Sequence, residues 1–261
     1  MSHELRERLA RRELLLGTFG VELGGRAVAY ALAQAGFEYL IVDAEHSTFG
    51  LEQIAHHVTA CRAAGIASVV RVPDNSRSAI TRVADMSPDA IMFPGVESEV
   101  EARRVVAAAK YSPLGQRGIC PMVQYSAAPA ADRYSILNDR LVLILQIEGT
   151  QALEEAPAIG RVPGVDALFV GTYDLSQSLG IPGELDDPRV YEAGRRLRSE
   201  LSSTTALGAY AHTGETAQRW IAAGASFIAY ATDGQLFLSA CHAAASSIRT
   251  QPRSGERRTT P

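Results

Sequence analysis

Lysine is almost absent from this chain. Of its 25 basic residues, only Lys110 is a lysine. An aldolase of the Schiff-base type needs a desolvated lysine in its active site. Lys110 ends an alanine-rich stretch (residues 107–109) and precedes a proline-containing segment (residues 111–113), a pattern that predicts a helix C-terminus, where a cation complements the helix dipole. The sequence therefore argues against Schiff-base chemistry, and any carbonyl chemistry would need a metal ion or a proton-relay group.

Cysteine is also scarce, and its spacing does not fit a metal site. The chain has three cysteines, Cys61, Cys120 and Cys241. Cys61 and Cys241 lie in helical patterns, so we expect them to be inert core residues. Cys120 lies in a polar loop, and the sequence leaves its role open.

Two further absences limit the possible partners. The net charge is -4, so neither a nucleic acid nor an anionic membrane surface is expected as a partner. No apolar run approaches the roughly 20 residues that span a bilayer, and residues 1–6 contain no apolar core of a signal peptide. We therefore expect a cytoplasmic protein without a membrane partner.

What the chain does contain is a regular alternation of apolar runs and helical patterns. Its 261 residues fit one large α/β barrel or two small domains. Eight strand–helix units favour a single TIM (β/α)8 barrel over residues 1–249, and the polar, arginine-rich residues 250–261 predict a disordered tail. The expected strands are Leu15–Phe19, Tyr39–Asp43, Ser68–Val72, Ala90–Phe93, Val142–Ile147, Ala167–Val170, Gly208–Ala211 and Phe227–Tyr230.

Helices are expected between these strands because the linking segments are rich in Ala, Leu, Arg and Glu and have a 3.6-residue periodicity. The connection from Tyr111 to Arg140 is too long for an ordinary loop, and long loops in compact domains are often functional. Examples of the expected helices are Gly25–Ala35, Leu51–Ala64, Glu99–Lys110, Asp187–Ser203 and Thr216–Ala223.

The most informative segment runs from Tyr39 to Ser47. Its apolar residues are followed by three ionisable ones, Asp43, Glu45 and His46. All strand C-termini of a TIM barrel face one pocket, so these side chains should meet polar residues that end other strands. Charges buried there need partners, a metal ion, or both. The other strand-end residues are Arg71, Gln146, Glu148 and Asp174.

Glu148 and Asp174 are the candidate metal ligands. Two carboxylates without a thiolate suit a hard or borderline divalent ion such as Mg²⁺ or Mn²⁺, completed by waters or substrate oxygens. The alternative is that each carboxylate pairs with an arginine or caps a helix. The segment Gly171–Asp174 also opens a helix, whose free N–H groups favour an anion such as a substrate carboxylate.

Arg71 and His46 are the candidate catalytic residues. The planar guanidinium of Arg71 suits bidentate binding of a carboxylate and could stabilise a developing enolate; the alternative is a structural ion pair with Glu45 or Asp43. Histidine titrates near neutral pH, which suits His46 to acid–base work. Asp43 could orient its imidazole, and the alternative for His46 is a capping or core role.

Five segments occur in a specific order between about Gly17 and Ala240. They are Val42–His46, Val70–Pro73, Tyr111–Gly118, Gln146–Gly149 and Val170–Gly180. Together they resemble the HpcH/HpaI aldolase family of class II pyruvate aldolases, which includes 4-hydroxy-2-oxoheptanedioate aldolase and 2-dehydro-3-deoxyglucarate aldolase. The resemblance implies a TIM barrel, a divalent metal ion (Mg²⁺, Mn²⁺ or Co²⁺), and a homohexamer built as a trimer of dimers with an exchanged C-terminal helix.

The resemblance also implies roles for single residues. Glu148 and Asp174 would hold the metal ion. Arg71 would bind the pyruvate part of the substrate and steady its enolate. His46, oriented by Asp43, would handle the proton, directly or through a water.

Four further positions follow from the same resemblance. Glu45 would hold metal-bound water, and Asp85 would reach the site of a neighbouring subunit. Tyr173 and Gln124 depart from the family pattern and leave the identity of the substrate open. The implied substrate-binding residues are Arg71, Gln146, Gly171, Thr172, Tyr173 and Asp174.

The leading hypothesis is a carbon–carbon lyase that cleaves a 4-hydroxy-2-oxo acid to pyruvate and an aldehyde, or runs the reverse condensation, through a metal-stabilised enolate. One alternative keeps the enolate with another partner, as in a citrate-synthase-like condensation or the decarboxylation of oxaloacetate. Another is a non-catalytic oligomeric barrel. Five ionisable residues at strand ends argue against the last, because burying them serves no purpose in a scaffold.

Overall fold

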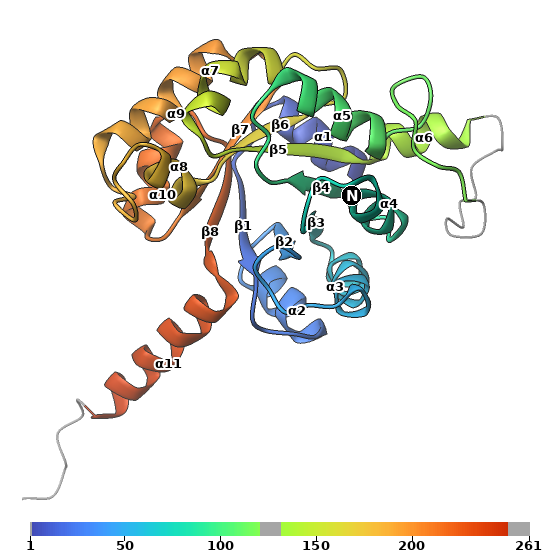
Figure 1. Ribbon diagram of the computed structural model, residues 1–261. Helices are drawn as coiled ribbons and strands as arrows, with labels where there is room; N and C mark the ends of the chain where they lie inside the picture. Colours follow the sequence, from blue (N-terminus) through green and yellow to red (C-terminus); the bar gives the residue numbers. More distant parts are fainter. Residues whose placement is uncertain (1, 121–131, 250–261) are drawn as a thin grey trace, which may run out of the picture.

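The computed structural model describes residues 2–120 and 132–249. Within them, eight parallel strands close into a barrel in which each strand pairs with its neighbour in sequence and β8 pairs with β1 (Figure 1). This is the predicted TIM barrel. The strands are β1 (Leu15–Gly20), β2 (Tyr39–Asp43), β3 (Ala67–Arg71), β4 (Ala90–Phe93), β5 (Val142–Ile147), β6 (Ala167–Val170), β7 (Ala206–Ala211) and β8 (Phe227–Thr232).

Helices surround the barrel, and the five helical ranges named from the sequence are all present with shifts of a few residues at their ends. Two helices were not predicted. One precedes the barrel, and the other lies inside the long connection of residues 111–140. The helices are α1 (Ser2–Ala10), α2 (Arg26–Gln34), α3 (Leu51–Ala64), α4 (Arg77–Asp85), α5 (Glu99–Ala109), α6 (Arg133–Arg140), α7 (Thr150–Ile159), α8 (Thr172–Ser178), α9 (Pro188–Glu200), α10 (Gly214–Ala222) and α11 (Asp233–Arg249).

Most strand residues are apolar because both faces of each strand are buried. In β2, Tyr39 and Ile41 pack inside the barrel, whereas Leu40 and Val42 pack against the surrounding helices. Side chains alternate along a strand, so the next inward position is Asp43, at the C-terminal end of β2. The same alternation brings other polar side chains to the C-terminal mouth of the barrel.

The single lysine lies far from that mouth. Lys110 is buried, and its Nζ donates to the carbonyl oxygens of Asn138 (2.6 Å) and Leu141. Both carbonyls lie at the C-terminal end of α6, next to the first residue of β5. The cation therefore does complement a helix C-terminus, but that of α6 and not that of its own helix. Burial lowers the pKa of Lys110 to about 8.

Helix α11 departs from the barrel pattern. Figure 1 shows it extending away from the barrel, and the only residue of α11 that is buried is Asp233. Cys241 lies on this helix and is exposed, so the prediction of a core cysteine is wrong there; Cys61 is buried as predicted, and Cys120 is exposed. In the described part of the chain, none of the helices has the length and apolar character required to cross a bilayer.

Candidate active site

Arg71 and Asp43 form the centre of the candidate site. Their strands run side by side, with Asp43 in register with Arg71. Arg71 donates from Nε and Nη2 to the two carboxylate oxygens of Asp43, at 2.9 and 2.6 Å. Its third nitrogen, Nη1, lies 3.2 Å from Oε2 of Glu45. The predicted alternative of an ion pair is thus present, yet one N–H on each of Nη1 and Nη2 remains for a substrate.

The charges in this group compensate one another. Burial lowers the pKa of Arg71, but its hydrogen bonds with Asp43 and the charges of Asp43 and Glu45 outweigh that effect and raise it overall. Burial raises the pKa of Glu45, and the nearby positive charge of Arg71 opposes the rise. Arg71 therefore stays cationic in the barrel mouth, where it can stabilise negative charge on a substrate.

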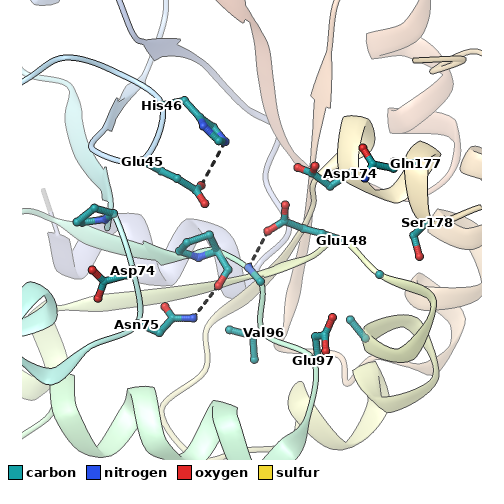
Figure 2. A pocket seen from close by; sticks show the side chains of 15 residues that line it. Glu45, His46, Asp74, Asn75, Val96, Glu97, Glu148, Asp174, Gln177 and Ser178 are labelled. Carbon is teal, nitrogen blue, oxygen red and sulfur yellow. Dashed lines mark hydrogen bonds and ion pairs between the residues drawn. The ribbon is translucent and has the colours of Figure 1, made fainter. Parts of the chain in front are cut away.

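His46 contacts Asp43 in a different way from the one predicted. Oδ1 of Asp43 accepts from the backbone N–H groups of Glu45 (2.9 Å) and His46 (3.3 Å), and the rest of the carboxylate is occupied by Arg71. Asp43 therefore positions the backbone of His46 and not its imidazole. The carboxylate nearest to the ring is that of Glu45, 3.7 Å from Nε2 (Figure 2). The His46 side chain is 63% exposed, so it can turn toward a bound substrate.

Glu148 and Asp174 face the same cavity from neighbouring strand ends (Figure 2). Oε1 of Glu148 accepts from the backbone N–H of Gly95 at 2.7 Å, which fixes the carboxylate. Burial, together with the carboxyl groups of Asp174 and Glu45, raises the pKa of Glu148 to about 7 against the opposing effect of the Gly95 N–H. Such an arrangement of two facing carboxylates is costly without a compensating cation.

The site comprises two adjoining cavities that share His46 and Asp174. The larger, of about 660 Å³, is acidic. The smaller, of about 290 Å³, contains Arg71 and has aromatic walls. The carboxylate residues that line the larger cavity are Glu45, Asp74, Glu97, Glu148 and Asp174.

The smaller cavity contains two buried polar atoms without partners. Oε1 of Gln146 and Oγ1 of Thr172 have no hydrogen bond among the described residues. Gly171 precedes Thr172, and a Cβ atom there would come within 2.7 Å of Cγ of Glu148 and 2.9 Å of Nε2 of Gln146. The intrahelical bonds of α8 begin with Leu175 N donating to Gly171 O (2.9 Å), so the preceding N–H groups of the helix are left for a ligand. These features are typical of a cavity shaped for a small polar molecule.

The donor set fits a divalent cation that keeps several non-protein ligands. No group of three or more His, Cys, Asp or Glu side chains among the described residues is arranged to hold a metal. Glu148 and Asp174 supply two carboxylates, and Mg²⁺ or Mn²⁺ is commonly bound by one or two carboxylates with waters and substrate oxygens. The buried Oε1 of Gln146, which has no hydrogen bond among the described residues, fits a polar ligand in the adjoining smaller cavity.

Tyr173 lies at the rim of the smaller cavity. Its side chain is exposed, and its ring centroid lies 5.7 Å from that of Tyr210. Tyr210 and Gln235 also line the cavity, and neither was recognised in the sequence. Tyr210 could have been found, because it occupies an inward position near the end of β7.

The roles predicted for Asp85 and Gln124 stay predictions. Arg117 donates from Nη2 to Oδ1 of Asp85 at 2.7 Å within the same chain, so a contact of Asp85 with a neighbouring subunit stays a prediction. Gln124 lies outside the described residues.

Comparison with known proteins places the chain in a family. Residues 21–240 match the model of the family described as HpcH/HpaI aldolase/citrate lyase. The chain is 34% identical over 257 residues to hydroxypyruvate/pyruvate aldolase from Paraburkholderia phytofirmans, covering 95% of this chain and 98% of the relative. It is 30% identical over 246 residues to 2-keto-3-deoxy-L-rhamnonate aldolase from Escherichia coli K12, covering 92% and 91%.

A solved structure agrees with these matches. The crystal structure of an HpcH/HpaI aldolase/citrate lyase family protein from Burkholderia cenocepacia J2315 superposes with a TM-score of 0.87 at 31% identity. The alignment covers 95% of this chain and all of that one. The fold is therefore shared along almost the whole chain.

Proposed function

The chain belongs to the HpcH/HpaI aldolase/citrate lyase family and is a carbon–carbon lyase; on that premise we propose that it is a divalent-metal-dependent aldolase. It cleaves a 4-hydroxy-2-oxo acid to pyruvate and an aldehyde, or runs the reverse condensation. The observation that carries this proposal is the paired carboxylates of Glu148 and Asp174 beside the cationic Arg71. The names of the two relatives support a 2-oxo acid as substrate.

Glu148 and Asp174 would hold the divalent ion, Mg²⁺, Mn²⁺ or Co²⁺. When bound, that ion supplies Lewis-acid polarisation of a ketone. The N–H groups that open α8, at Thr172, Tyr173 and Asp174, would bind the substrate carboxylate.

Arg71 would steady the negative charge that develops on the 2-oxo oxygen during bond cleavage. The remaining N–H groups on Nη1 and Nη2 are available for this contact, because Asp43 and Glu45 occupy the other side of the guanidinium. Fixing the arginine before the reaction lowers the reorganisation that charge stabilisation would otherwise require. Asp43 is thus a positioning residue for Arg71.

His46 would accept the proton of the 4-hydroxyl group, directly or through a water. It lines both cavities and is exposed enough to reach a substrate. The carboxylate of Glu45, the charged group nearest to the ring, lies 3.7 Å from Nε2. As the hydroxyl loses its proton, the carbon–carbon bond breaks, and its electron pair passes to the 2-oxo acid part.

The test is a screen for pyruvate release from several 4-hydroxy-2-oxo acids with Mg²⁺, Mn²⁺ or Co²⁺. We expect release that EDTA and Glu148→Ala both abolish, with Glu154→Gln, an exposed acid on α7, as control. Full activity in metal-free buffer would contradict the metal-dependent mechanism. Incubation with oxaloacetate, alone and with acetyl-CoA, tests the decarboxylase and citrate-synthase-like alternatives.

We also propose that residues 1–249 form one domain and that α11 docks on a second copy of the chain, as in a hexamer built from dimers. The helix extends from the barrel and exposes large apolar side chains, Phe237, Leu238 and Ile248. Light scattering tests this: Phe237→Glu/Leu238→Glu should reduce the assembly to smaller species. An unchanged mass, or a monomeric parent protein, would contradict it.

A further inference from the structure

The first turn of α11 forms part of the wall of the smaller cavity. Thr232 and Gln235 line that cavity together with Tyr210 of β7. Oε1 of Gln235 accepts from the Tyr210 hydroxyl at 3.1 Å and from the backbone N–H of Thr232 at 3.0 Å. The backbone N–H of Gln235 donates in return to Oγ1 of Thr232 at 3.2 Å. The glutamine is therefore held at both its backbone and its side chain.

These bonds determine which way the Gln235 amide faces. A backbone N–H is only a donor, so the atom that it contacts must be the carbonyl oxygen and not the NH₂ group. The same oxygen receives the Tyr210 hydroxyl, which must then donate its single proton to it. The phenolic oxygen of Tyr210 consequently has lone pairs but no proton to offer to the cavity.

The surroundings of Tyr210 keep its hydroxyl neutral and restrict its position. The ring is buried, and burial raises the pKa of Tyr210 to about 12, so the hydroxyl stays neutral near pH 7. Its ring packs edge-on against Phe19 at 6.1 Å, which limits where the oxygen can move. The Tyr210 oxygen is therefore a fixed acceptor on the aromatic side of the cavity, and a ligand group that lies next to it must donate a hydrogen bond.

We propose that Gln235 is a positioning residue that turns Tyr210 into a hydrogen-bond acceptor and so makes the site select substrates with a hydroxyl group next to the reacting carbonyl. The selected group is a hydroxyl because the corresponding methyl or methylene group cannot donate. This inference rests on the proposed aldolase function. It adds to that function a preference that neither the metal ligands nor Arg71 would produce.

Two pairs of near-isosteric substrates test the proposal in the full-length protein with Mn²⁺. The acceptor pair is glycolaldehyde and propanal with pyruvate, and the donor pair is hydroxypyruvate and 2-oxobutanoate with a common aldehyde. A neutral hydrogen bond changes the ratio of kcat/KM by about 3- to 10-fold. The wild-type protein should prefer the hydroxylated member by that factor in at least one pair.

Variants separate positioning from general damage. Tyr210→Phe and Gln235→Met should bring that ratio close to one, because kcat/KM for the hydroxylated substrate falls more than kcat/KM for the other substrate. Gln235→Glu retains the acceptor and should retain the preference. Tyr230→Phe, on β8 outside the cavity, is the control. The proposal is overturned if the wild-type protein shows no preference, or if Gln235→Met keeps it.

The failure of this inference differs from the failure of the aldolase proposal. Exchange of the pyruvate methyl protons for deuterium, followed by NMR, reports enolate formation without any acceptor. Exchange with equal use of both members of each pair would overturn the selectivity alone. Absence of exchange and of all condensation would overturn the aldolase function itself.

Discussion

Glu148→Gln should make the metal-free protein more stable while it removes metal binding and activity. In the metal-free protein, burial and the neighbouring carboxyl groups raise the pKa of Glu148 from 4.5 to about 7. The folded state then binds more protons than the unfolded state between these values, so the free energy of unfolding falls as pH rises from about 4.5 to about 7. Glutamine is uncharged and its Oε1 can still accept from Gly95 N.

The magnitude follows from the same shift. One pKa unit corresponds to about 1.4 kcal/mol, so an ionised Glu148 costs about 3 kcal/mol at pH 8 relative to the unfolded chain. Glu148→Gln should therefore raise the free energy of unfolding by up to about 3 kcal/mol at pH 8 in EDTA. Near pH 4, where the carboxyl group is protonated in both states, the variant and the parent should be alike.

The assay is urea unfolding at several pH values with EDTA or Mn²⁺. Mn²⁺ should stabilise the parent protein, and more at pH 8 than at pH 6, because the ion requires the ionised carboxylate. It should not stabilise Glu148→Gln. Glu154→Gln should behave like the parent throughout. The reasoning is refuted if Glu148→Gln is less stable than the parent at pH 8 in EDTA, or if Mn²⁺ stabilises it equally.

Three other changes test separate parts of the structure. Asp43→Asn breaks a buried ion pair, so it should lower the free energy of unfolding in urea by about 3 kcal/mol. Its main kinetic effect should be a lower kcat, with a smaller change in KM. A change in KM alone would contradict the role of Asp43 in fixing Arg71. Asp233→Ala removes the carboxylate that accepts from the N–H groups of Val21, Glu22 and Leu23. Hydrogen exchange at these amides should accelerate while the core strands stay protected. Unchanged exchange would show that residues 21–23 are held by other contacts. Because Lys110 is buried, an amine-reactive label should modify the folded chain only at its α-amino group, and a second label should be added after unfolding. Lys110→Met should lose only that second label. Labelling of Lys110 in the folded protein would contradict its burial.

Much of the fold follows from local patterns. The predicted bounds of β2, β4, β5 and β6 match the structure to the residue, because a short apolar run between polar segments is a local signal. Helix α6 was missed because most of its residues are polar and no apolar stripe marks a buried face. It is held by tertiary contacts such as the hydrogen bonds of Asn138 with the backbone of Tyr111.

The sequence by itself determined the barrel, the polar residues at its strand ends and the family, because each depends on residue type and order along the chain. Only the tertiary structure decided which of these residues meet. Arg71 rather than the imidazole of His46 binds Asp43, Lys110 reaches the end of α6, and Gln235 orders the hydroxyl of Tyr210. These partners lie 28, 28 and 25 residues apart. Contacts at such separations depend on strand register and side-chain direction, which sequence spacing does not encode.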